Sequence, residues 1–173
     1  MSESEVARRV RELAETFDRS FASPARVRED DGRPGLAVRV GGDPYLLFLE
    51  GLSSVSRKKA IVPLPGGSSA QLGVSGIRGA LVGVFSLPAL LGYDVALARI
   101  SWLAVAGGAR PVALAFEGLD GQVVVPPSSV AAAPSSARRH VSGLAHLAGE
   151  PSARGVLDLG SMLARIAAVA GGE

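Results

Sequence analysis

The apolar residues of this chain follow two different spacings. In the first 23 residues they recur at steps of four, three, four and four positions, which places them on one face of an α-helix. That face consists of Val6, Val10, Leu13, Phe17 and Phe21. From Leu36 onward the apolar residues form short runs separated by glycine and proline, as in β-strands. The pattern predicts an N-terminal amphipathic helix over residues 1–23, a polar linker over 24–35 and a mainly β domain over 36–170.

Three short blocks of the β domain occur twice, in the same order and with nearly the same spacing. The pairs are Glu50-Gly51-Leu52 with Glu117-Gly118-Leu119, Val74–Ile77 with Val141–Leu144, and Gly83–Leu87 with Gly155–Leu159. A single short match arises easily by chance, but three ordered matches indicate an internal duplication. We therefore predict a first repeat over about residues 36–93 and a second over about 100–166.

Each repeat opens with the pattern of a β-hairpin, two apolar runs joined through Gly41-Gly42 or Gly107-Gly108. The run Ala80–Phe85 is apolar almost throughout, which predicts a strand buried on both faces. The other predicted strands are Leu36–Val40, Tyr45–Leu49, Ile100–Val105, Val112–Phe116 and Val123–Val125, and short helices are predicted at Pro88–Leu91 and Ser161–Ile166. Small lobes of this kind bury little surface alone, so we expect the two repeats to pack through a shared apolar seam.

The composition narrows the classes of function. With 47% hydrophobic and 20% charged residues the chain is predicted to form a filled core rather than a disordered segment. A formal net charge of +2 and an aromatic content of 5% argue against nucleic acid as a partner. No cysteine is present, and no apolar run has the length of a signal peptide or a membrane span. We therefore expect a cytoplasmic protein without disulfides and without direct membrane insertion.

No residue pattern typical of an enzyme is found. His140 and His146 are too far apart in sequence to share a helix face as a metal-binding pair, and Lys58-Lys59 lacks the glycines of a phosphate-binding loop. Glu50 and Glu117 occupy equivalent positions of the repeats, which favours a structural role over an acid–base pair. The sequence predicts no catalytic residue, no metal site and no cofactor. An enzyme with an unfamiliar site would require a pocket of convergent polar groups.

The segment Leu72–Gly79, followed by the apolar run Ala80–Leu87, resembles the signature of the CheW-like domain family, Gly-Val-Ile-Asn-Leu-Arg-Gly before an apolar strand. Ile61–Pro65 is similar to the Pro-x-x-Pro loop ahead of that signature, and Gly155–Leu163 to the closing Leu-Asp-Leu segment. The similarity extends from Leu36 to Ile166. It implies a fold of two intertwined five-stranded, SH3-like β-barrel lobes.

The resemblance also implies a function. Members of this family are chemotaxis adaptors of bacterial two-component signal transduction, without enzymatic activity. They link the cytoplasmic tip of methyl-accepting chemoreceptors to the regulatory domain of a CheA-type histidine kinase. The signature arginine is Arg78, whose guanidinium either binds a partner carboxylate or fixes its own loop. The candidate protein-binding residues are Arg78, Leu52, Val55, Ile77 and Gly79.

Three positions depart from the family pattern. Ser54 stands where the family often has the acidic partner of the arginine, Gly76 replaces the asparagine of the signature, and Ser86 replaces the aspartate of the following strand. One alternative is therefore a degenerate member that binds only one partner or acts as a competitor. Another is a barrel-type binding module for a different ligand. The N-terminal helix face either packs on the β domain, docks a partner or pairs with a second copy.

Overall fold

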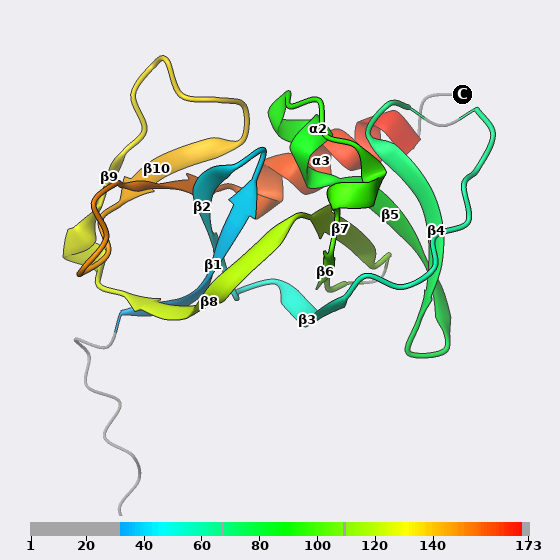
Figure 1. Cartoon of the computed structure of the whole chain (residues 1–173), viewed down its shortest axis with the longest axis horizontal. Helices are drawn as coiled ribbons and strands as arrows, with labels where there is room; N and C mark the ends of the chain where they lie inside the picture. Colours follow the sequence, from blue (N-terminus) through cyan, green and yellow to red (C-terminus); the bar gives the residue numbers. More distant parts are fainter. Residues whose placement is uncertain (1–31, 67, 109, 171–173) are drawn as a thin grey trace, which may run out of the picture. The chain divides into compact units, whose positions relative to one another are not determined.

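The computed structural model describes residues 32–66, 68–108 and 110–170. The predicted N-terminal helix, its apolar face from Val6 to Phe21 and most of the predicted linker lie outside these residues, and so does the question of self-association through that helix. The described residues are mainly β, as predicted, and form two sheets with short helices packed beside them (Figure 1).

The first sheet, called sheet 1, has six strands in the order β8-β1-β2-β11-β10-β9, and the second, called sheet 2, has five in the order β3-β6-β7-β5-β4. The strands of sheet 1 are β1 (Arg33–Val40), β2 (Asp43–Phe48), β8 (Gly118–Val125), β9 (Val130–Ala132), β10 (Val141–Ala145) and β11 (Arg154–Leu157). Those of sheet 2 are β3 (Leu52–Arg57), β4 (Gln71–Ile77), β5 (Ala80–Ser86), β6 (Trp102–Ala106) and β7 (Val112–Phe116). The helices are α2 (Leu87–Leu91) and α3 (Leu159–Ala170), and two 3₁₀ turns are η1 (Leu97–Arg99) and η2 (Pro127–Ser129).

The two repeats exchange their opening hairpins. The hairpin β1–β2 of the first repeat lies in sheet 1, where β1 pairs with β8 and β2 runs parallel to β11, both from the second repeat. The hairpin β6–β7 of the second repeat lies in sheet 2, where it pairs in the same way with β3 and β5 of the first repeat. Each sheet therefore contains strands of both repeats, and neither sheet can form from one repeat alone.

Sheet 2 approaches closure without a continuous ladder. After β3, the chain returns to the opposite edge of the sheet, where Val62 and Val74 of β4 exchange two backbone hydrogen bonds of 2.8 and 2.9 Å. The predicted lobes were closed barrels. Within the described residues both sheets are open, and the bridge between Val62 and Val74 is the contact that brings sheet 2 nearest to a barrel. Gly73 has φ of 137°, and a side chain there would overlap the carbonyl group of Val62, so glycine allows the two segments to meet.

Glycine pairs mark the hairpins as predicted. Val40 pairs with Asp43 across Gly41 and Gly42, which have φ of 63° and 88° and so form a tight two-residue turn. The second hairpin joins β6 to β7 by a longer loop that contains Gly107 and Gly108. The predicted strand Val112–Phe116 coincides with β7, and the predicted helices lie within α2 and α3.

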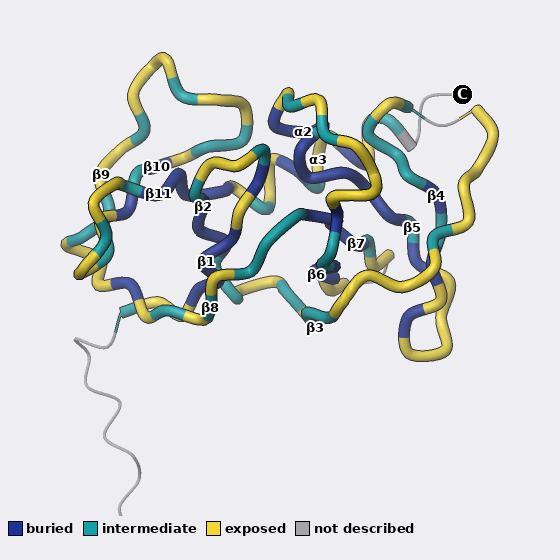
Figure 2. The backbone as a smooth tube through the Cα atoms, in the orientation of Figure 1, coloured by how far each residue is buried: buried dark blue, intermediate teal, exposed yellow. Residues whose placement is uncertain are grey.

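The apolar side chains form one large core, which takes residues from both sheets and from α2 and α3, and two smaller ones, the first in sheet 2 and the second in sheet 1. The buried segments are dark blue in Figure 2. The large core contains Leu47 of β2, Phe116 of β7, Leu87 of α2 and Met162 of α3, all fully buried. Because it takes residues from both sheets, it corresponds to the predicted apolar seam. The core of sheet 2 contains Ile77 and Val82 from the two arms of the β4–β5 hairpin. This core supports the hairpin from beneath and leaves its other face free.

Candidate functional site

The β4–β5 hairpin presents two chemically different faces. Across antiparallel strands, paired residues point to the same side, and alternate residues point to opposite sides. Val74 pairs with Gly83 and Gly76 pairs with Leu81, whereas Ser75 pairs with Val82 between them. The inner residues are buried: Ser75, Ile77, Val82 and Val84. The other side is called here the outer face of the hairpin and consists of Val62, Val74, Gly76, Leu81 and Gly83.

The outer face exposes large apolar side chains. The exposed fraction is 80% for Leu81 and 60% for Val62, which the bridge to Val74 holds on the same side of the sheet. The strand Ala80–Phe85 was predicted to be buried on both faces, and for its first half this is wrong: Phe85 joins the large core, but Leu81 points to solvent. The reason is that Gly76 and Gly83 bring no side chain to this face, and α2 packs only near the far end of β5. The hairpin tip accordingly lies exposed in Figure 2.

Arg78 lies in the two-residue turn of this hairpin. It has φ of 51° and Gly79 has φ of 80°, both in the left-handed region, and the flanking Ile77 and Ala80 pair with each other. Arg78 and Gly79 are exposed. Within the described residues no hydrogen bond or ion pair holds the Arg78 side chain, so its guanidinium is available to a partner.

The structure brings only part of the predicted site together. Ile77 adjoins the Arg78 turn but is 5% exposed, so it supports the turn from the core. Leu52 and Val55 lie on β3, which forms the opposite edge of sheet 2 from β4, and both are half-buried against the large core. The residues that the sequence analysis missed are Leu81 and Val62. The exposure of Leu81 could have been predicted, because Gly76 and Gly83 have no side chains to cover it.

The three departures from the signature lie in different places. Ser54 is on β3, where it pairs with Val105. Ser86 lies at the end of β5 remote from Arg78, and its Oγ accepts a hydrogen bond of 3.2 Å from the N–H of Ala89, which caps α2. Ser86 is therefore not placed to anchor Arg78. Of the three positions, Gly76 alone adjoins the turn.

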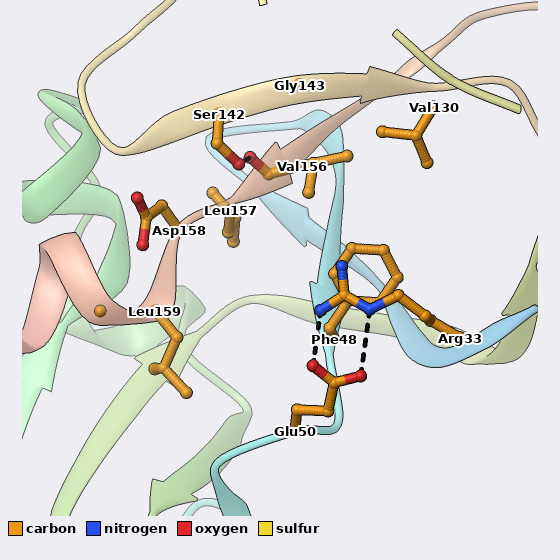
Figure 3. Close-up of a pocket in the computed structure, with 11 residues that line it drawn as sticks. Arg33, Phe48, Glu50, Val130, Ser142, Gly143, Val156, Leu157, Asp158 and Leu159 are labelled. Carbon is orange, nitrogen blue, oxygen red and sulfur yellow. Dashed lines mark hydrogen bonds and ion pairs between the residues drawn. The ribbon is translucent and has the colours of Figure 1, made fainter. Parts of the chain in front are cut away.

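A groove of about 310 Å³ lies between sheet 1 and the start of α3 (Figure 3). Its charged groups are already paired: Arg33 donates two hydrogen bonds to Glu50, at 3.0 and 2.6 Å, and lies 3.8 Å from the centre of the Phe48 ring. This hydrogen bonding holds the pKa of the Glu50 carboxyl below its usual range. Asp158 accepts a hydrogen bond of 2.9 Å from the N–H of Ser161 at the start of α3. These groups stabilise the fold and offer no free acid–base pair.

The glutamate at the equivalent position of the second repeat is also engaged. Glu117 accepts a hydrogen bond from the N–H of Gly41 and forms an ion pair of 3.2 Å with Arg99. Within the described residues no group of three or more histidine, aspartate or glutamate side chains is placed to hold a metal ion. None of the helices described is long and apolar enough to cross a membrane.

Comparison with known proteins agrees with this architecture. The model of the family "CheW-like domain" matches residues 34–167. A solved structure, the scaffolding protein TtCheW from Thermoanaerobacter tengcongensis, has a similar fold, with a TM-score of 0.65 and 13% sequence identity over 74% of this chain and 90% of that chain. Among curated protein sequences, none matches this chain. The family match covers most of the chain, and with the two interlocked sheets described above it places the chain in the CheW-like domain family, a family of chemotaxis adaptors and scaffolds that act through protein–protein interaction.

Proposed function

We propose that this chain is a non-enzymatic adaptor of the cytoplasm that links chemoreceptors to a CheA-type histidine kinase. The observation that carries the proposal is the outer face of the β4–β5 hairpin, where the exposed apolar side chains of Leu81 and Val62 lie beside the turn of Arg78. An apolar centre with a charged rim is the usual composition of a protein-binding patch.

The chemistry of this patch suits a protein partner better than a small molecule. Gly76 and Gly83 bring no side chains to this face, so Leu81 and Val62 stay open to contact from outside. Burying a leucine side chain such as Leu81 on a partner contributes about 1.5–3 kcal/mol. Arg78 adds a planar, permanently charged fork that favours a carboxylate on the partner and so fixes the orientation of binding.

The hydrogen bonds and ion pairs of three acidic side chains support a function without enzymatic activity. Glu50, Glu117 and Asp158 each hold an arginine or a backbone N–H, and so each already has a structural role. A general acid or base has to be free to exchange a proton with a substrate. The proposed function therefore depends on surfaces and not on a reactive centre.

A second candidate function is an adaptor that binds only one of the two partners and competes with a complete adaptor. It is favoured by the β3 edge, where Ser54 supplies no carboxylate and the apolar Leu52 and Val55 are half-buried. This edge offers a weaker surface than the β4–β5 hairpin. A protein with one strong and one weak surface would occupy one partner without joining it to the other.

Calorimetric titration separates these possibilities. The full chain would be titrated with the regulatory domain of a CheA-type kinase, then with the cytoplasmic tip of a chemoreceptor, and finally with one in the presence of the other. Saturable binding of both, without mutual exclusion, is expected for a linking adaptor. Binding of one partner alone would support the competitor, and binding of neither by the folded protein would contradict both candidates.

A further inference from the structure

A second cavity lies apart from the outer face of the hairpin. It has a volume of about 430 Å³ and lies beside the ends of α2 and α3, which are neighbours in Figure 1. Its walls come from four parts of the chain: the segment ahead of β4, the loop ahead of β10, α2 and α3. Its volume falls within the range typical of small-molecule sites, roughly 300–1,000 Å³.

The charged lining of this cavity is positive. Arg139 and His140 line it from the loop ahead of β10, and Arg165 lines it from α3, whereas no aspartate or glutamate is among its lining residues. Within the described residues neither arginine forms an ion pair. Burial and the nearby charges of Arg139 and Arg165 hold the pKa of His140 below its usual range, although the Asp158 carboxylate opposes this shift. Both arginines and the imidazole line the same cavity.

A buried hydroxyl beside this cavity lacks a hydrogen-bond partner, as do those of Ser56 and Ser75 elsewhere in the described residues. The Oγ of Ser68, which lines the same cavity, is buried and has no hydrogen-bond partner within the described residues. A buried hydroxyl without a partner is unfavourable by about 1–3 kcal/mol, so such groups are usually found where a ligand or an ordered water completes them. His140 donates to or accepts from the Ser161 hydroxyl through Nδ1 at 2.7 Å, which leaves its Nε2 without an assigned partner.

We propose that this cavity binds a small organic phosphate, with Arg139 and Arg165 holding the phosphoryl oxygens and the Ser68 side chain turning toward the ligand to complete their coordination. Two guanidinium groups and a hydroxyl provide the charge-assisted hydrogen bonds that a phosphate accepts. Besides the polar Ser69 and His140, the rest of the lining is apolar, with Ala70, Ala89, Leu90 and Val169 placed to contact the organic part of the molecule. This ligand site is additional to the proposed adaptor function and does not depend on it.

The test uses the full chain, labelled with ¹⁵N, and phenyl phosphate as the probe at constant ionic strength, because exposed charges attract any anion at low salt. Saturable shifts of the amide signals of Ser68, Ala70 and His140 are expected with phenyl phosphate, weaker binding with inorganic phosphate, and no shifts with phenol. Arg139→Ala and Arg165→Ala are each expected to weaken binding about 10-fold or more, since a charge-assisted hydrogen bond contributes on the order of a tenfold change in affinity.

Two further variants keep the result unambiguous. Arg110→Ala removes an exposed arginine outside this cavity and is expected to leave the affinity unchanged. Ser68→Ala removes the unpartnered hydroxyl and is expected to weaken binding while leaving the melting temperature unchanged or raised, because no hydrogen bond is lost. The proposal is overturned if phenyl phosphate produces no saturable shifts, or if Arg110→Ala weakens binding as much as the cavity variants do.

Discussion

Arg154 of β11 and Asp120 of β8 form an ion pair of 2.8 Å across sheet 1, although two other strands lie between β11 and β8. The Arg154 side chain is 3% exposed and also donates hydrogen bonds of 2.7 Å to each carboxylate oxygen of Glu150. Its Nη1 also donates hydrogen bonds of 3.4 Å to the carbonyl oxygens of Val38 in β1 and Tyr45 in β2. One buried guanidinium therefore connects strands contributed by both repeats.

Replacement of this arginine is expected to destabilise the fold. Arg154→Leu would leave Glu150 without its cation, Asp120 with Arg39 alone, and two carbonyl groups without a donor, at a loss of about 3 kcal/mol in the free energy of unfolding. This is the lower end of the range for buried pairs, because the two carboxylates are 33% and 30% exposed. Urea unfolding would measure the loss. Arg33→Leu is the control, because its pair with Glu50 is exposed to solvent and should contribute far less to stability. Equal effects of both variants would contradict the prediction.

The same ion pair predicts a dependence of stability on pH. Burial alone would raise the pKa of Asp120, but hydrogen bonds from Arg154 and Arg39 outweigh it and hold the pKa below its ordinary value of 3.8. The folded state therefore binds the proton more weakly than the unfolded state, so the stabilisation is present above about pH 4 and is lost as the pH falls below it. The difference in unfolding free energy between the natural chain and Asp120→Asn should shrink from pH 6 to pH 3. A constant difference would show that the carboxylate charge contributes nothing.

The outer face of the β4–β5 hairpin predicts a variant that separates binding from folding. Leu81→Asp places a charge on a side chain that is 80% exposed, so the free energy of unfolding should change by no more than about 0.5 kcal/mol. Binding to the partner that uses this face should weaken at least tenfold, because an apolar contact becomes a buried charge. Val124→Asp, at a position 60% exposed on β8, is the matched control. If both variants bind equally well, the hairpin face is not the binding surface.

The turn at Arg78 allows charge and backbone to be tested apart. Arg78 occupies the left-handed region with φ of 51°, which glycine adopts without strain, so Arg78→Gly should change stability by no more than about 1 kcal/mol in either direction. The same variant removes the guanidinium and is expected to weaken partner binding, whereas Arg78→Lys should restore it only in part because lysine lacks the bidentate fork. Thermal unfolding and calorimetric titration of the same samples would measure the two effects. Loss of stability with intact binding would assign Arg78 to the loop alone.

Much of the fold follows from local sequence features. Gly41-Gly42 predicts a hairpin because a two-residue turn with positive φ at both positions selects glycine, and the structure confirms it. The duplication predicts two similar sets of strands. The periodicity of apolar residues, however, does not specify which strands pair, so it cannot predict the exchange of hairpins between the repeats. The short strand β9 was missed for a related reason, because three residues carry too little pattern.

The site was predicted less completely than the fold. Arg78 and Gly79 were named as candidates because the resemblance to the signature places them in a turn, and the structure has them in one. An apolar run, however, does not show which of its members faces a core. Leu81 was therefore predicted to be buried, but it is exposed, because its cross-strand neighbour Gly76 has no side chain to cover it. Arg154 was missed as well, because its partners Asp120 and Val38 lie far away in sequence and meet it only through the exchanged strands.

The contact between Gly73 and Val62 predicts how the outer face is held in place. Gly73→Ala would add a methyl group against the carbonyl of Val62 at a backbone φ of 137°, so the bridge to Val74 has to open and the free energy of unfolding should fall by at least about 2 kcal/mol. Gly76→Ala is the matched control in the same strand, because a Cβ there meets nothing within 4 Å. Hydrogen exchange at the Val62 and Val74 amides should speed up in the first variant alone. If Gly76→Ala proves equally destabilising, the loss reflects any side chain on β4 and not the bridge that keeps Val62 beside Leu81.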